Sequence, residues 1–173
     1  TAFMKDLHCP NCGTPFVRVR YQAGTVERVL NRFKVFPFRC QLCMNQFRAF
    51  WPSSPDASRV FDRREFKRLP ASFQTKALTE QTTRSEHHLT DISMGGCTLE
   101  TAAVIPKGTF LELLIKPASD EEAIKVETAM VCSVRPESVG VQFLEFLPEE
   151  QHRLSQVILS LWVGKSLHPS PYS

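Results

Sequence analysis

Apolar and polar residues alternate along much of the second half of the chain, a pattern that predicts short β-strands. The alternating segments cover residues 72–79, 87–101, 108–116, 123–135 and 140–146. Turn residues separate them, among them Gly108, Pro117 and the run PESVG that ends at Gly140. Several short strands with few helical patterns between them indicate a mainly β fold, either a barrel or a sandwich.

The apolar spacing becomes helical after residue 147. Pro148 suits the first turn of a helix, and Gly164 is expected to end it. We expect this helix to cap an open end of the β-structure; the alternative is a helix that binds a partner. The apolar residues that recur at helical spacing are Leu154, Val157, Ile158, Leu161 and Trp162.

The first third of the chain also carries strand-like patterns. Residues 16–21 alternate, and residues 26–30 and 33–38 continue the strand-like pattern, with a turn expected at Ala23 and Gly24. Residues 51–62 are rich in proline and serine and predict a linker. The expected organisation is a small domain at 4–50, a linker at 51–62, a larger domain at 63–164 and a tail at 165–173.

Charge is divided unevenly along the 173 residues, whose formal net charge is +3. Residues 1–50 hold eight Lys or Arg and two acidic residues. Residues 51–173 hold thirteen Lys or Arg and sixteen acidic residues. The basic excess of the first third predicts an anionic partner, and the alternative is that the charge serves solubility alone.

No apolar run approaches the roughly 18 residues that a membrane span requires. The N-terminus also lacks the basic-then-apolar pattern of a secretory signal. We therefore expect a cytoplasmic protein without a membrane span.

Two CxxC pairs predict a metal site in the first third. Cys9 and Cys12 form one pair, and Cys40 and Cys43 form the other. Two such knuckles supply the four sulfurs of a tetrahedral, structural Zn²⁺ site, and we expect one zinc ion per chain. A redox role agrees less well with the sequence, because a thioredoxin-like site needs one CxxC within a βαβ pattern, which this sequence lacks.

Two knuckles that pin a short antiparallel sheet resemble a zinc ribbon. Zinc ribbons bind proteins as well as nucleic acids, so the resemblance leaves both kinds of partner open. The basic residues available for such a surface are Arg18, Arg20, Arg28, Arg32, Lys34 and Arg39.

Two further motifs carry the chemistry of a nucleotide site. Arg64 and Arg68 form RxxxR, and Asp91, Ser93 and Gly96 form DxSxxG. Guanidinium groups can donate in pairs to phosphate oxygens and to the O6 and N7 atoms of guanine. A carboxylate can accept from guanine N1 and N2, and a hydroxyl can donate to a phosphate. Taken separately, the basic run could be a solvated surface and DxSxxG a simple turn.

In this order and spacing, the two motifs resemble those of the PilZ family over roughly residues 59–163. The resemblance implies a six-stranded antiparallel β-barrel with a C-terminal helix that binds cyclic di-GMP through these five residues. It also implies that Arg63, which precedes the pair, accompanies binding of a stacked pair of ligand molecules.

The prediction is therefore a bacterial cyclic di-GMP receptor in which ligand binding reorients a zinc ribbon that contacts a protein. A nucleic-acid-binding zinc-ribbon protein is the alternative. An enzyme is not expected, because the sequence shows no paired catalytic carboxylates near the motifs and no P-loop. The remaining cysteines, Cys97 and Cys132, are expected to be small core residues, and His87 and His88 surface residues.

Overall fold

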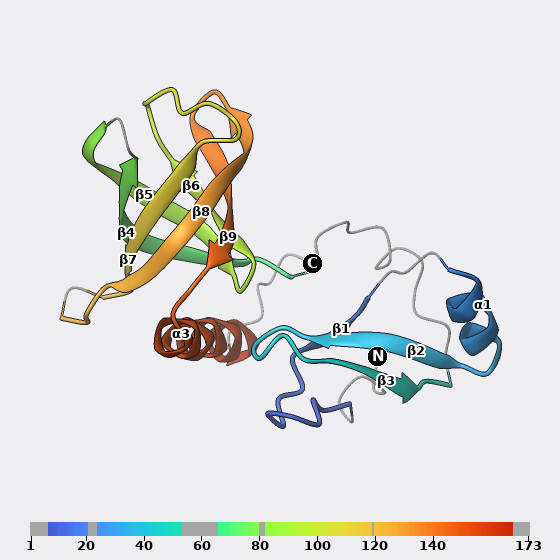
Figure 1. The fold of residues 1–173 in the computed structure, drawn as a ribbon. Helices are drawn as coiled ribbons and strands as arrows, with labels where there is room; N and C mark the ends of the chain where they lie inside the picture. Colours follow the sequence, from blue (N-terminus) through green and yellow to red (C-terminus); the bar gives the residue numbers. More distant parts are fainter. Residues whose placement is uncertain (1–6, 21–23, 53–65, 80–81, 119, 168–173) are drawn as a thin grey trace. The chain divides into compact units, whose positions relative to one another are not determined.

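The computed structural model describes residues 7–20, 24–52, 66–79, 82–118 and 120–167 (Figure 1). The chain divides into two compact units, Thr1–Lys67 and Arg68–Ser173. Within the described residues, no helix has both the length and the apolar character needed to cross a bilayer.

The second unit contains a closed six-stranded barrel, as the family resemblance implied (Figure 1). Around the barrel the strands follow the order β4-β5-β6-β9-β8-β7, and each neighbouring pair is antiparallel. Their bounds are β4 (Leu69–Thr79), β5 (Thr82–Ser93), β6 (Gly96–Glu100), β7 (Phe110–Lys116), β8 (Ile124–Arg135) and β9 (Ser138–Glu145). The alternating segment at 87–101 is thus shared between β5 and β6 and includes the turn that joins them.

Alternate side chains of the strands fill the barrel. In β7, Leu111, Leu113 and Ile115 are at most 2% exposed, whereas the residues between them are half-buried. Successive residues of a strand point to opposite faces of the sheet, so this alternation fixes which face of each strand lines the interior. Burial of these apolar side chains is the main source of the barrel's stability.

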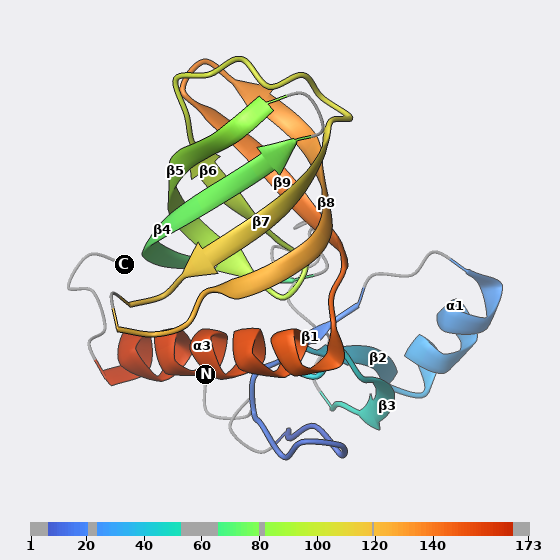
Figure 2. The ribbon, with the colours of Figure 1, turned by 60° about the vertical axis from the view of Figure 1, so that its left-hand side comes forward.

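The helix α3 (Pro148–Leu167) lies across one end of the barrel (Figure 2). Its residues Leu154 and Ile158 are almost completely buried. Near its start, a Glu150 carboxylate oxygen accepts a hydrogen bond from the Lys125 backbone N–H at 3.0 Å. The helix thus caps the barrel, as expected. It does not end at Gly164, because Gly164 does not adopt the left-handed backbone conformation that terminates a helix.

The first unit contains a three-stranded antiparallel sheet of order β1-β2-β3, made of β1 (Val17–Val19), β2 (Val35–Cys40) and β3 (Gln46–Phe50). The segment 26–30, predicted as a strand, is instead part of the helix α1 (Thr25–Arg32). The strand prediction followed its valines, but Val26, Val29 and Leu30 are spaced as on a helix face. The backbone of Lys34, at φ 59°, then leads the chain out of the helix.

Candidate nucleotide site and metal cluster

Strand pairing brings the described residues of the two nucleotide motifs together. Arg68 immediately precedes β4, and Asp91 and Ser93 end β5. The register places Asp91 opposite Pro70, and Ser93 opposite Gly96 at the start of β6. Arg63 and Arg64 lie outside the described residues, so their predicted positions stay predictions.

Arg68 is held by two polar side chains on the neighbouring strands. Its Nη1 donates to Oδ1 of Asp91 at 3.1 Å and to Oγ1 of Thr98 at 2.7 Å. The side chain of Arg68 is 16% exposed and that of Asp91 is 32% exposed. The guanidinium is therefore fixed in direction while part of it and of the carboxylate remains accessible.

The hydroxyl of Ser93 stabilises the turn that links β5 and β6. It accepts from the Gly95 backbone N–H at 3.2 Å and donates to the Gly96 carbonyl at 3.3 Å. Ser93 itself is buried. In this arrangement the serine holds the motif's backbone in shape, and its contact with a phosphate stays a prediction.

Gly96 is required by the packing of β6 against β9. A Cβ atom at this position would lie 2.2 Å from the backbone carbonyl oxygen of Val141, much closer than atoms can approach. The structure shows a close approach to β9 that excludes a side chain by itself.

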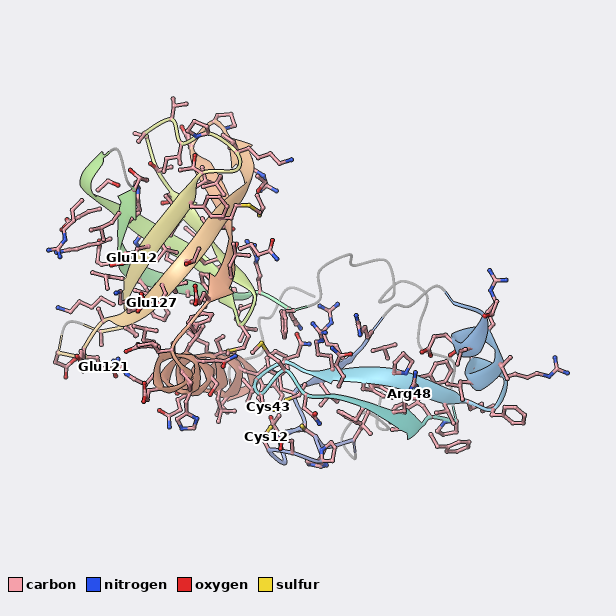
Figure 3. All side chains as sticks on the ribbon, in the orientation of Figure 1. Cys12, Cys43, Arg48, Glu112, Glu121 and Glu127 are labelled. Atoms are coloured by element: carbon pink, nitrogen blue, oxygen red, sulfur yellow. The ribbon has the colours of Figure 1, made fainter. Side chains whose placement is uncertain are left out.

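The four cysteines of the CxxC pairs converge in the first unit. Their Sγ atoms all lie within 4.8 Å of one another. The Cys9–Cys43 and Cys12–Cys40 sulfur separations are both 3.5 Å. Figure 3 labels Cys12 and Cys43 close together, at the opposite end of the three-stranded sheet from α1. Four sulfurs placed ~2.3 Å from a tetrahedral Zn²⁺ would stand about 3.8 Å apart, so the cluster can hold such an ion.

Tight turns aim the thiols inward. Gly13 has φ 72°, a conformation that favours glycine, and its N–H donates to the Cys9 carbonyl at 2.8 Å. In the second knuckle, Met44 also has positive φ, and the Leu42 N–H points at Sγ of Cys40 at 3.4 Å. Such N–H groups stabilise thiolates, which are the form that binds metal.

The cluster contains thiols of different acidity. Burial raises the pKa of Cys40 and of Cys12. Burial acts in the same direction on Cys43, but hydrogen bonds from the Asn11 side chain and the Asn45 backbone outweigh it and lower the pKa of Cys43 to about 7. Metal binding would therefore release protons from the less acidic members.

A family model for the PilZ domain matches residues 62–160. The chain belongs to the PilZ domain family. None of the curated proteins compared with it matches.

Solved structures share the fold of this PilZ protein. The PilZ domain with c-di-GMP of YcgR from Escherichia coli is 18% identical with a TM-score of 0.51, over 61% of this chain and 97% of that one. The inhibitor of motility MotI/DgrA from Bacillus subtilis is 18% identical with a TM-score of 0.52, over 76% and 69%. The MrkH–c-di-GMP complex of K. pneumonia is 14% identical with a TM-score of 0.52, over 89% and 79%. At these identities the likeness establishes the fold alone.

Thr98 contacts Arg68 but belongs to neither motif, and the sequence analysis did not name it. The signal was available, because the turn pairs Ser93 with Gly96. Counting outward along the two strands from that pair leads to Asp91 opposite Thr98, which is the register observed.

The histidines of β5 lie in a different part of the PilZ domain. His87 was predicted at the surface, but it is buried, because Ser85, His87 and Leu89 alternate toward the interior. Its Nε2 lies 2.7 Å from Oγ of Ser85, and burial lowers the pKa of His87. His88 is half-buried, with Nε2 3.2 Å from Oγ of Ser72. Both histidines line an open groove of about 830 Å³ to which none of the motif residues contributes.

The two cysteines outside the cluster lie on strands. Cys97 on β6 is completely buried, as expected of a small core residue. Cys132 on β8 is only half-buried, and its Sγ donates to the Gly140 carbonyl at 3.2 Å.

Proposed function

We propose that this PilZ protein is a receptor for cyclic di-GMP. The observation that carries the proposal is the placement of Arg68 between Asp91 and Thr98, beside the turn formed by Ser93 and Gly96. This arrangement presents a guanidinium and a carboxylate, which are the two groups that a guanine nucleotide can pair with. Two of the similar structures, those of YcgR and MrkH, contain c-di-GMP.

Each motif residue has a chemical role in this proposal. Arg64 and Arg68 donate in pairs to phosphate oxygens or to guanine O6 and N7, and Asp91 accepts from guanine N1 and N2. Among the described residues Asp91 pairs with Arg68 through Oδ1, which leaves Oδ2 for this role. Arg63 would serve a second, stacked ligand molecule.

We further propose that the cysteine cluster binds one structural Zn²⁺ through Cys9, Cys12, Cys40 and Cys43. Four thiolates complete the coordination of the ion, so it would have no open position for a substrate. The metal would pin both knuckles of a sheet that is too small to rely on an apolar core alone.

Ligand binding would be transmitted to the zinc ribbon through the chain that joins the two units. Arg63, Arg64 and Arg68 lie at the end of that connection. A ligand that they hold against the barrel would fix the connection and reorient the ribbon, which would then contact a protein partner. As a receptor, the protein would bind the nucleotide without converting it.

Calorimetric titration of the whole chain with cyclic di-GMP tests the receptor proposal, with cyclic di-AMP as the matched control. Binding of cyclic di-GMP with at least tenfold preference supports it, and equal or absent binding contradicts it. The stoichiometry reports on Arg63, because two ligands per chain are expected if a stacked pair binds.

Hydrogen exchange tests the coupling. Amides of residues 52–68 should exchange more slowly when cyclic di-GMP is bound. Equal rates in the presence of demonstrated binding would contradict transmission through this segment while leaving the receptor function intact.

The alternative, a nucleic-acid-binding ribbon, is favoured only by the basic residues of the first unit. It predicts a gel shift with arbitrary DNA whose strength falls steeply as salt is raised.

A further inference from the structure

The helix α1 exposes its apolar face. Val26, Val29 and Phe33 are 65%, 58% and 67% exposed, respectively. They are spaced by three and four residues, so they form a single stripe along the helix and its C-cap. An amphipathic helix of a small domain normally turns such a stripe toward its own core.

The residue that α1 buries is polar instead, and Leu30, three positions further on, is half-buried. Glu27 is 6% exposed, and its Oε1 accepts from Nη2 of Arg48 on β3 at 2.8 Å. Figure 3 labels Arg48 at the end of the ribbon where α1 lies. A half-exposed arginine that pairs with a buried carboxylate fixes the rotation of the helix. The outward direction of the apolar stripe therefore follows from a specific contact.

Phe50 extends the apolar area onto the sheet. It is 65% exposed at the end of β3, and the register places it opposite Val35, which begins β2 two residues after Phe33. Phe50 and Arg48 lie two residues apart on β3 and so share a face of the sheet. The α1 surface is defined here as Val26, Val29, Phe33 and Phe50.

Positive charge borders the α1 surface. Arg28 and Arg32 are exposed on the same helix, and Lys34 follows it. Residues 1–52 contain only two acidic residues, Asp6 and Glu27, and Glu27 is paired with Arg48. A partner that meets this surface must therefore combine apolar side chains with negative charge.

We propose that the α1 surface docks an acidic amphipathic helix of a partner protein. Such a helix would place apolar side chains against Val26, Val29, Phe33 and Phe50, and carboxylates against the flanking arginines. Nucleic acid fits less well, because its phosphates would lie against Val26 and Val29. The inference names the surface and the chemistry of the partner in the function proposed above, and it rests on the ribbon's role as the module that contacts a protein.

The test uses a fluorescent helical peptide of about 18 residues, five helical turns, with leucines on one face and glutamates beside them. The matched probe carries lysines in place of the glutamates. Anisotropy with the whole chain at about 0.15 M salt, where distant charges are screened, should show at least tenfold tighter binding of the glutamate peptide. Replacing Arg28 and Arg32 together by Gln should remove most of that preference.

Variants that leave the charge unchanged test whether the apolar side chains of the α1 surface bind the peptide. Val29→Ser and Phe33→Ser, alone and together, should weaken the glutamate peptide about tenfold or more, whereas Val104→Ser should not. Val104 is 91% exposed but belongs to the second unit. Zinc content is measured for each variant, and if Phe33→Ser loses the metal, the Val29→Ser and double arginine variants decide the result.

Equal binding of the two peptides, or binding that survives the serine and glutamine substitutions, would overturn the proposal. Single-stranded DNA of about 20 nucleotides and phosphatidylglycerol vesicles are negatively charged, like the glutamate peptide. If either of them binds more strongly than the glutamate peptide, and the serine variants abolish that binding, the proposal is also overturned. Cyclic di-GMP is titrated into the same samples. If cyclic di-GMP does not bind, the receptor function is refuted, whereas the result for the peptide is unaffected.

Discussion

Nη1 of Arg68 lies 3.1 Å from Oδ1 of Asp91, although 23 positions separate the two residues in the sequence. This contact joins the RxxxR and DxSxxG motifs. Its value lies in orientation, since an arginine already held in place loses less side-chain freedom when a ligand binds.

Thr98 should support this orientation. Thr98→Val keeps the shape of the side chain but removes the oxygen that accepts from Arg68 at 2.7 Å. Loss of one hydrogen bond predicts a three- to tenfold weaker affinity for cyclic di-GMP, about 1 kcal/mol, by calorimetry. Thr128→Val is the matched control, because the Thr128 hydroxyl contacts Glu145 on other strands. Unchanged affinity in Thr98→Val would show that this hydrogen bond does not prepare the site.

Two glycines should respond oppositely to alanine. Gly96→Ala would place a methyl group against the Val141 carbonyl and should lower the free energy of unfolding by about 1–3 kcal/mol. Gly164→Ala has open space around the new Cβ and lies within α3, so it should be neutral or raise stability by up to about 1 kcal/mol. Urea denaturation of both variants measures these changes. A stable Gly96→Ala protein would contradict the packing explanation of the motif glycine.

The cysteine cluster should carry one zinc ion per chain. Elemental analysis of protein purified without added metal or chelator should find it, and Cys40→Ser should lose it because one sulfur ligand is gone. Amides of β1, β2 and β3 should then exchange faster, while those of the barrel should not. Cys132→Ser, outside the cluster, should keep the metal. Wild-type protein without metal would refute the site.

His87 should make the barrel sensitive to mild acid. Burial lowers the pKa of His87 in the folded chain, whereas the unfolded chain has a pKa of about 6.5. Between the two values the unfolded chain binds the extra proton, so stability present above pH ~6.5 is lost as pH falls, by up to about 1.4 kcal/mol per pH unit. Urea denaturation between pH ~7.5 and ~5.5 should show this loss, and His87→Gln should reduce it.

His88→Gln is the matched control for that series. His88 is the half-buried neighbour of His87 on the same strand. An identical pH dependence for wild type and His87→Gln would exclude His87 as the cause.

The strands could be predicted from the sequence because each is buried on one face, whereas their closure into a six-stranded barrel was implied by the family resemblance. Burial then imposes an alternation, as in Leu111, Leu113 and Ile115, that is visible without coordinates. The cysteine cluster was equally accessible, since the CxxC spacing is a property of one turn. At the proposed nucleotide site, the motifs named the candidate residues, and hairpin counting could have added Thr98.

Other features depend on tertiary contacts that local patterns do not contain. The valines of α1 favour a strand, and the helix faces outward because Glu27 reaches Arg48, which lies on a strand 21 residues further on. Gly164 ends no helix because the chain around it keeps helical geometry. His87 is buried because the register of β5 turns it inward, although histidine itself is common at surfaces.

Calorimetric titration of Arg68→Ala with cyclic di-GMP tests the receptor proposal most directly, beside wild type and Arg84→Ala as an exposed arginine on β5. Arg68→Ala removes a charge-assisted donor, so affinity should fall roughly ten- to hundredfold, whereas Arg84→Ala should bind like wild type. Unchanged affinity in Arg68→Ala, with the barrel folded, would contradict the assignment of the site.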